Sequence, residues 1–308
     1  TLTGTDDEDA TSISATVTAT DEDAGNSSLI FSLSSTSGSY GDISIGSSSG
    51  IWTYILDSTA TTVLDAGDSV TDTFTVTVTD DQSATATGVI TVTVTGVNDD
   101  PVIGETLTGS DDEDATSISA TVVVTDVDED ASVIYEITDT TGSYGEISID
   151  SSSGYWVYTL DSSSTTLFNE GDVYTDTFSL TVTDDQGAQV TDEIEVTLTG
   201  VNDNPVLGGT LTGTDNEDAT SISATVTATD EDAGNASLTF SLSSTSGSYG
   251  DISIGSSSGI WTYTLDSTET TKLDTGDSVT DTFTVTVTDD QSATATGVIT
   301  VTVTGVND

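Results

Sequence analysis

The chain has 308 residues, of which 54 are acidic and one is basic, so its formal net charge is −53. This charge excludes nucleic acid and anionic membrane surfaces as partners, because no basic surface exists to meet them. The chain has no cysteine and no histidine, which excludes disulfides and removes the residues that most often act as catalytic nucleophile or base.

Apolar residues alternate with threonine and serine throughout the chain, and this alternation predicts half-buried β-strands instead of the disorder that such a charge would otherwise indicate. Glycine and serine clusters separate the strands, and no helical period appears. Seven short strands in about 100 residues are typical of an antiparallel immunoglobulin-like sandwich. In chain order, the first strands are expected at residues 1–4, 12–20, 28–35, 42–45, 51–56, 72–80 and 88–96.

The sequence repeats itself three times. The segment TLTGTDDEDATSISATV begins at Thr1 and returns with small changes at Thr106 and Thr210, at intervals of 105 and 104 residues. A unit of this size is large enough to have its own core. The sequence therefore predicts three separately folded all-β domains, and because the pattern is cut at both ends we expect them to be part of a longer array; their predicted bounds are 1–100, 101–204 and 205–308.

Several motifs resemble known families. The segments GSYGDISIGSSSGIWTYILD, LDAGDSVTDTFTVTVTDDQ and VTVTGVNDDPV resemble the VCBS-type repeat of very large bacterial surface proteins. The segment ATDEDAGNSSLIFSLS, together with the Asn-Asp-x-Pro linker, resembles cadherin repeats. The resemblance covers the whole chain, and it implies extracellular, tandem, cadherin-like seven-stranded sandwiches within a bacterial adhesin.

Acidic residues gather in the turns at the strand ends, where Ca²⁺ sites are commonly built. Calcium takes six to eight oxygen ligands at roughly 2.3–2.6 Å, so such a site needs loops that converge at one end of a domain. The recurring candidates precede a strand, form Asp-x-Asp after one, end one, or lie in a linker: Glu8, Glu113, Glu217; Asp21, Asp23, Asp126, Asp128, Asp230, Asp232; Asp80, Asp184, Asp289; Asn98, Asp99, Asp100, Asn202, Asp203, Asn204.

The resemblance to cadherins implies that each joint between domains draws ligands from the first domain, the linker and the second domain. Pro101 and Pro205 would stiffen the exit from the linkers. The acidic pair that cadherins carry in an LDRE stretch has no clean match, which leaves the number of ions open; the recurring acids there are Asp68, Asp172 and Asp277. The first joint would use Glu8, Asn98, Asp99, Asp100, Asp126, Asp128 and Asp184, and the second Glu113, Asn202, Asp203, Asn204, Asp230, Asp232 and Asp289.

Two simpler interpretations compete with this one. The acids could serve solubility or adaptation to high salt, although charge with that purpose would be spread more evenly than it is here. One tryptophan per copy could stack on a sugar, but its place in an alternating strand predicts a core residue instead; the three are Trp52, Trp156 and Trp261.

We therefore expect a non-catalytic protein, extracellular and either secreted or on a bacterial surface, with calcium ions and neighbouring repeats as partners. The leading hypothesis is a calcium-stiffened spacer that holds the binding part of an adhesin away from the cell. The alternatives are a self-assembling filament or biofilm-matrix repeat and a glycan-binding module. No apolar run is long enough to insert in a membrane.

Overall fold

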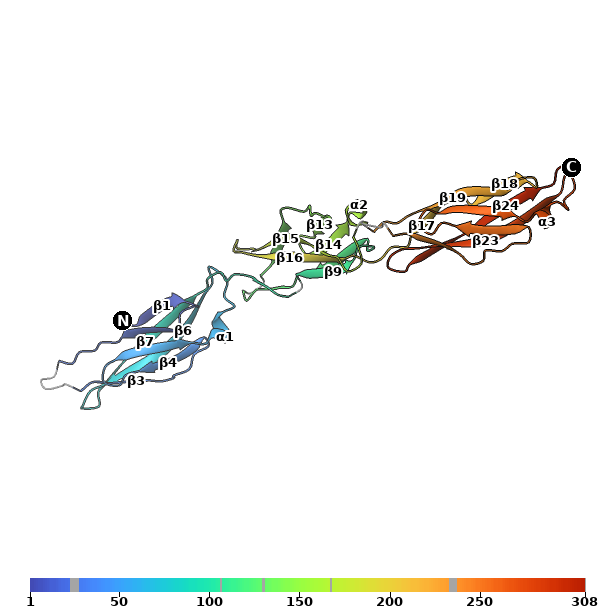
Figure 1. Ribbon diagram of the computed structural model, residues 1–308. Coiled ribbons are helices and arrows are strands. Elements are labelled where there is room, and N and C mark those ends of the chain that lie inside the picture. The colour runs from blue at the N-terminus through green and yellow to red at the C-terminus, as the bar shows by residue number, and fades with distance from the viewer. Residues whose placement is uncertain (23–27, 106, 129–130, 167, 233–236, 308) are drawn as a thin grey trace.

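The computed structural model describes residues 1–22, 28–105, 107–128, 131–166, 168–232 and 237–307. Three β-sandwiches lie end to end along the chain, with the first and third at opposite ends of an elongated molecule (Figure 1). We call them repeats 1, 2 and 3. Within the described part of the chain, no helix is long and apolar enough to cross a membrane.

Repeat 1 is a sandwich of a four-stranded sheet, in the order β1-β7-β6-β3, and a three-stranded sheet, in the order β2-β5-β4. Its alternating residues place one face of each strand inside, as the sequence predicts. Its elements are β1 (Thr3–Asp7), β2 (Ser12–Thr16), β3 (Ile30–Leu33), β4 (Gly41–Ile45), β5 (Ile51–Leu56), α1 (Ser58–Thr61), β6 (Ser69–Thr79) and β7 (Thr85–Thr95).

Repeat 2 has the same two sheets, in the orders β12-β15-β16-β9 and β10-β14-β13, and adds a short pair, β11-β8. The added strand β8 directly follows the linker. The elements are β8 (Val102–Ile103), β9 (Thr108–Asp112), β10 (Ser117–Thr121), β11 (Val124–Thr125), β12 (Val133–Ile137), β13 (Gly145–Ile149), β14 (Tyr155–Leu160), α2 (Ser162–Thr165), β15 (Val173–Asp184) and β16 (Gln189–Thr199).

Repeat 3 has two four-stranded sheets, in the orders β18-β24-β23-β20 and β17-β19-β22-β21. Strand β17 corresponds to β8 and pairs antiparallel with the end of β19. The elements are β17 (Val206–Gly209), β18 (Thr212–Asn216), β19 (Ser221–Thr229), β20 (Thr239–Leu242), β21 (Gly250–Ile254), β22 (Ile260–Leu265), α3 (Ser267–Thr270), β23 (Ser278–Thr288) and β24 (Thr294–Thr304).

The structure confirms the all-β sandwich class and differs from the expectation in three details. The first full strand of each repeat pairs parallel with the last, as β1 does with β7, so the sandwiches are not purely antiparallel. Repeats 2 and 3 each begin with an additional strand directly after the linker, β8 and β17, which we call the linker strands, and repeat 2 also has the short strand β11 that pairs with β8. Each repeat also has a one-turn helix, too short to show a period; in α1 the carboxylate of Asp57 accepts a hydrogen bond from the backbone N–H of Thr59 at 3.0 Å.

Each repeat has its own apolar core. The three tryptophans are fully buried, with an exposed fraction of 0%, which confirms their assignment to the core and leaves no ring face for a sugar. The tyrosine two residues further along the strand is equally buried in every repeat: Tyr54, Tyr158 and Tyr263.

A buried carboxylate fixes one turn of each sandwich. In repeat 1 the hydroxyl of Tyr54 donates to Asp72 Oδ2 at 2.6 Å, and the backbone amides of Ser39 and Tyr40 donate to the same carboxylate at 2.9 Å each. Burial, together with the hydrogen bond to Asp72, raises the pKa of Tyr54 well above its ordinary value. Gly38 is required beside this carboxylate, because a Cβ there would lie 2.0 Å from Asp72 Oδ2. The same bond joins Tyr158 to Asp176 and Tyr263 to Asp281.

Candidate metal centres between the repeats

The parallel pairing of the first and last strands brings acidic loops to the joint between repeats 1 and 2, which we call joint 1. Since β1 and β7 run in the same direction, both end at this joint. The backbone N–H of Glu8 donates to the carbonyl oxygen of Thr95 at 3.0 Å. The carboxylate of Glu8 in turn accepts a hydrogen bond from the backbone N–H of Val97 at 2.8 Å. Glu8 is thereby fixed against the start of the linker.

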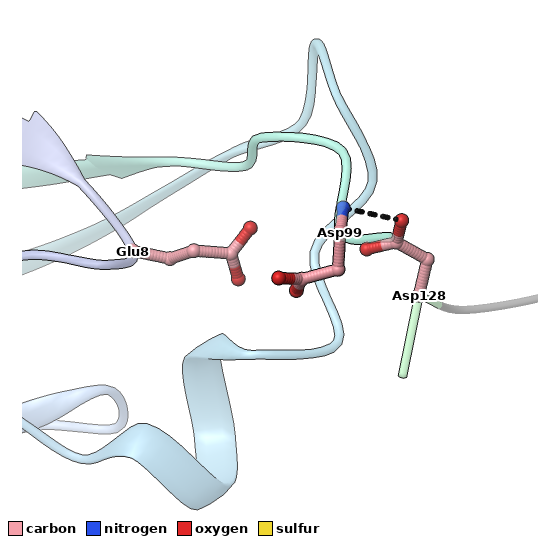
Figure 2. A group of neighbouring side chains, drawn as sticks. All are labelled: Glu8, Asp99 and Asp128. Atoms are coloured by element: carbon pink, nitrogen blue, oxygen red, sulfur yellow. Dashed lines mark hydrogen bonds between the residues drawn. The ribbon is translucent and has the colours of Figure 1, made fainter. Parts of the chain in front are cut away.

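The linker reaches across joint 1 to repeat 2. The backbone N–H of Asp99 donates to Asp128 Oδ2 at 3.0 Å, and the side-chain amide of Asn98 donates to Asp184 Oδ2 at 2.8 Å. Figure 2 shows the carboxylates of Glu8 and Asp99 facing each other, with Asp128 beside them. One oxygen from each of these three residues lies within 4.8 Å of the others, a spacing that fits ligands at the calcium–oxygen distance from one ion.

The same arrangement recurs between repeats 2 and 3, at joint 2. Glu113, Asp203 and Asp232 form a cluster with the same spacing of ligand atoms. The backbone amides of Val201 and Asp203 donate to the carboxylates of Glu113 and Asp232 at 2.9 and 3.1 Å. The side chain of Asn202 donates to Asp289 at 3.1 Å. The repeated sequence therefore builds the same geometry twice.

Both joints contain buried oxygen atoms that accept no hydrogen bond from any of the described residues. At joint 1 these are Glu8 Oε2, Asn98 Oδ1, Asp126 Oδ2 and Asp128 Oδ1; at joint 2 they include Glu113 Oε2, Asn202 Oδ1 and Asp230 Oδ2. A buried acceptor without a donor costs free energy, and a buried unpaired carboxylate costs more. The chain has a single basic side chain, Lys272, which pairs with Glu269 at 2.7 Å. These donor-poor oxygen sets fit a hard cation from solution.

Burial and electrostatic repulsion both raise the pKa values of the clustered acids. Burial raises the pKa of Glu8, and the charges of Asp99 and Asp128 add to this. The pKa of Asp99 and that of Asp128 are also raised, first by burial and then by neighbouring carboxylates. The acids of the second cluster behave in the same way: Glu113, Asp203 and Asp232.

The carboxylates that end the long strands differ from these. Burial alone would raise the pKa of Asp184, but hydrogen bonds from Asn98 and from backbone amides outweigh it, so that this pKa lies below its ordinary value. The pKa of Asp289 is lowered for the same reasons, with Asn202 as the side-chain donor. These two acids stay ionised and hold the linker asparagines in place.

The structure brings most of the expected ligands to the joints and leaves the others at the outer ends of the repeats. Three at each joint form the clusters described above, and four more lie beside them through hydrogen bonds, Asn98, Asp184, Asn202 and Asp289. Asp126 and Asp230 also lie at the joints, where they accept hydrogen bonds from the backbone N–H groups of Asp128 and Asp232, respectively. Asp100 and Asn204 lie in the linkers, and their side chains are exposed. Asp21 and Asp80 lie at the outer end of repeat 1 and Glu217 at that of repeat 3, whereas Asp23 is outside the described residues.

The three acids assigned to the loop after the one-turn helix lie outside the clusters. Asp172 accepts hydrogen bonds from the backbone and side chain of Asn169 at 3.2 and 3.1 Å. Asp277 accepts one from the backbone N–H of Asp274 at 3.0 Å, and Asp68 is exposed. At least two of these side chains therefore stabilise their own turn.

Sequence reasoning missed two acids whose charges reach joint 1. The charge of Asp65 contributes to the raised pKa of Asp128, and that of Asp9 contributes to the raised pKa of Asp99. Asp9 directly follows Glu8 in every copy and could have been found from that repetition. Asp65 was harder to find because repeat 2 has Asn169 there; an amide oxygen is also a calcium ligand, so a search for any oxygen ligand would have succeeded.

Comparison with known proteins identifies the fold and the family. Residues 98–200 and 202–305 match the bacterial cadherin-like domain, and residues 1–93 match a bacterial Ig domain. No similar protein was found among the curated proteins. The VCBS-type repeat named from the sequence remains a prediction.

A solved structure of cadherin repeats shows the same fold. The chain is 23% identical to human CDH23 EC21–23, covering 98% of this chain and 96% of that one with a TM-score of 0.53. It is 21% identical to mouse Cadherin-23 EC22–24, covering 99% and 96% with a TM-score of 0.49. Domains of the two matched families are typically extracellular, non-enzymatic structural modules, and cadherin-like domains typically bind calcium. The chain belongs to the bacterial cadherin-like domain family.

Proposed function

We propose that this chain is a calcium-stiffened spacer of a long bacterial surface adhesin. The observation that supports this most strongly is the set of buried oxygen atoms without donors at the joints, contributed by the end of one repeat, the linker and the start of the next. An ion held by Glu8, Asp99 and Asp128 would connect all three segments. It would supply the positive charge that the cluster lacks, and each linker would lose its freedom to bend.

The bodies of the repeats suit a spacer. Each has its own core and a buried Tyr–Asp bond, so we expect each sandwich to fold without an ion at the joints. A strand of 11 residues, such as β6, spans about 37 Å. Three sandwiches in line therefore give a rod of at least about 110 Å. A rod of near-identical units provides length, whereas recognition is usually served by loops that differ between units.

Without an ion, the same carboxylates would repel one another across each joint. The linkers would then act as hinges while the sandwiches stay folded. Because the repulsion is between charges only a few ångströms apart, ordinary salt cannot remove it as a bound divalent ion can; the Debye length is still about 8 Å at physiological ionic strength.

Small-angle X-ray scattering of the full chain, first in calcium and then in chelator at constant ionic strength, tests this proposal. We expect a rod with one maximum dimension in calcium and a broader, on average shorter, distribution in chelator. The Asp99→Ala, Asp203→Ala double variant should give the chelator profile even in calcium. A matched control, Asp42→Ala with Asp251→Ala, removes the same charge from exposed positions outside the joints and should behave like the unmodified chain. An unchanged maximum dimension in chelator would contradict the proposal.

A further inference from the structure

A pocket lies beside the acidic cluster of joint 2. It has a volume of about 330 Å³, and both repeats and the linker contribute to its lining. Repeat 2 supplies residues 113–116 and several residues within 159–166, around α2, while the linker supplies Asp203 and the loop after β19 supplies Glu231. The volume lies in the range of small-ligand sites, about 300–1,000 Å³.

One buried hydroxyl that lines this pocket has no partner. Thr165 of α2 is 1% exposed, and its Oγ1 forms no hydrogen bond with any described residue. The equivalent hydroxyl of repeat 1, that of Thr61, donates to the carbonyl oxygen of Asp57 at 3.2 Å, and that of Thr270 in repeat 3 makes the corresponding bond at 3.1 Å. A buried polar group without a partner costs free energy. A ligand that bonds to Thr165 Oγ1 would remove this cost.

The pocket also carries two acids that the metal cluster does not use. Asp114 and Glu231 line it with exposed side chains. The pKa of Asp203 is raised first by burial and then by neighbouring charges, which include those of Asp114 and Glu231. In the part of the chain that the structure describes, neither of these two acids belongs to a group of three that could share a metal ion. An ion in the cluster would therefore leave both charges uncompensated.

Joint 1 has apolar side chains at two of the equivalent positions. Ile55 replaces Thr159, and Val127 replaces Glu231. The side chains of Ile55 and Val127 are 60% and 52% exposed, so the corresponding surface of joint 1 is apolar. Of the two joints, only joint 2 therefore offers this polar lining, and we expect one site for the pair.

We propose that the pocket at joint 2 binds a primary alkylammonium group, carried by a free diamine or by a lysine side chain. An ammonium has three donors and no acceptor, which complements a lining of carboxylate and hydroxyl oxygens. Thr165 Oγ1 would accept one of its hydrogen bonds, and Asp114 and Glu231 would supply the opposite charge. The half-buried Ala115 and Leu160 would contact the methylene groups of its stem. A neutral polyol would leave both charges uncompensated, and an anion would be repelled.

The ligand would contact repeat 2, the linker and repeat 3 at once, so it would stiffen joint 2 in addition to an ion in the cluster. Its binding and that of calcium can be measured separately, because Thr165 and Glu231 are outside the cluster. A chain that binds the amine but no calcium would contradict the spacer function and leave this site standing. A chain that binds calcium at both joints but no amine would do the reverse.

Isothermal titration calorimetry of the full chain with putrescine, an unbranched diamine, tests the site in saturating calcium and at physiological ionic strength. We expect one saturable equivalent. The double variant Thr159→Ile, Glu231→Val gives joint 2 the residues of joint 1 and should weaken binding at least about tenfold. Thr165→Val should weaken it severalfold. The matched control Glu22→Val removes the same charge from the equivalent loop of repeat 1 and should leave binding unchanged.

Two further compounds complete the test. Butanediol, the uncharged analogue of putrescine, should not bind. Saturable binding of N-acetyl-lysine methylamide would assign the site to a lysine side chain, whereas binding of putrescine alone would assign it to a free diamine. The inference is overturned by the absence of saturable binding, by equal binding of butanediol, or by an unchanged affinity in the Thr165→Val chain and the double variant. Equal weakening by Glu22→Val would show that only the overall negative charge attracts the amine.

Discussion

Joints 1 and 2 have the same arrangement of ligand atoms but differ in the number of charged side chains around it. At each joint a glutamate and two aspartates form the cluster with the same spacing of ligand atoms. Around that cluster, Asp100 of the first linker is replaced by Asn204 in the second, and Asp65 is replaced by Asn169. An asparagine keeps an oxygen ligand and removes a charge. The comparison teaches that the repeats preserve the positions of the ligands while the charge around them is free to vary.

The loop that carries the Asp-x-Asp motif adds one charge at joint 2 and so partly offsets this difference between the joints. Val127 lies between the two aspartates at joint 1, whereas Glu231 lies there at joint 2 and contributes to the raised pKa of Asp203. Because the affinity of calcium sites is tuned by the number of charged ligands and by rigidity, the two joints should fill at different calcium concentrations. Joint 1, with the larger number of nearby carboxylates, should fill first.

The largest expected effect comes from removing a carboxylate of one cluster. Asp128→Ala should weaken calcium binding at joint 1 by about 100-fold, or about 2.7 kcal/mol, and leave joint 2 unchanged. Asp232→Ala should do the reverse. The joints are one sandwich apart, about 37 Å along an 11-residue strand and several Debye lengths, so each should respond alone. Isothermal titration calorimetry with calcium measures both sites, and loss of both from either single variant would show that the joints are not independent.

A substitution in the body of a repeat separates the sandwiches from the joints. Tyr54→Phe removes the donor to Asp72 Oδ2 in the buried turn of repeat 1 and should lower the free energy of unfolding of that repeat by about 1–3 kcal/mol. Denaturant unfolding in chelator gives this value, with Tyr263→Phe as the matched change in repeat 3. Calcium affinity should be the same as in the unmodified chain; a changed affinity would mean that body and joint fold as one unit.

Exchanging the charges of the linkers sharpens the comparison most directly. Asp100→Asn should weaken joint 1 and Asn204→Asp should strengthen joint 2, each by about three- to tenfold, or about 0.7–1.4 kcal/mol. Both side chains are exposed, so neither change should disturb packing. Calorimetry of the double variant should show the order of filling reversed. Shifts in the same direction at both joints would refute the role of linker charge.

Acidity should affect the two forms of the protein in opposite ways. The raised pKa values of Glu8, Asp99 and Asp128 come from burial and from like charges. In the ion-free chain, the ionised cluster therefore costs stability above the folded-state pKa values, and this cost disappears as the pH falls through them. Calcium binding should instead weaken a few-fold between about pH 7.5 and about pH 5.5, because protons compete for the same oxygens. Calcium titrations at the two pH values measure the change in affinity, and thermal unfolding in chelator measures the change in stability of the ion-free chain.

Much of the fold is predictable from the sequence because it depends on local patterns. Alternating residues such as Phe74 and Val76 define the inner faces of the strands, and the tandem copies define the number of sandwiches. The same alternation places Asp72 on the inner face beside Phe74, so the burial of Asp72 is also predictable from the sequence. The direction of β1 was not, because a four-residue pattern carries no information about which strand it will pair with.

Most residues of the candidate site can be predicted from the sequence, but the contacts between their side chains cannot. Glu8, Asp99 and Asp128 were all expected ligands, and the structure gathers them; binding of an ion by them remains a prediction. Asp65 was missed because an asparagine replaces it in repeat 2. The length of β2 was overestimated at residues 12–20, because the last four residues become a strand only when a linker strand pairs with them, and that is a tertiary effect.

The parallel pairing of the first and last strands has a mechanical consequence. A pull on the two ends of a sandwich draws β1 and β7 along each other in opposite directions. Since the bonds of a parallel pair lie across this direction, they carry the load together, in shear, and cannot open one at a time as they would in a peeled hairpin. The register from Thr3 with Thr91 to Asp7 with Thr95 in repeat 1, and the equivalent parallel pairs of repeats 2 and 3, are thus the parts of the sandwiches that would resist stretching.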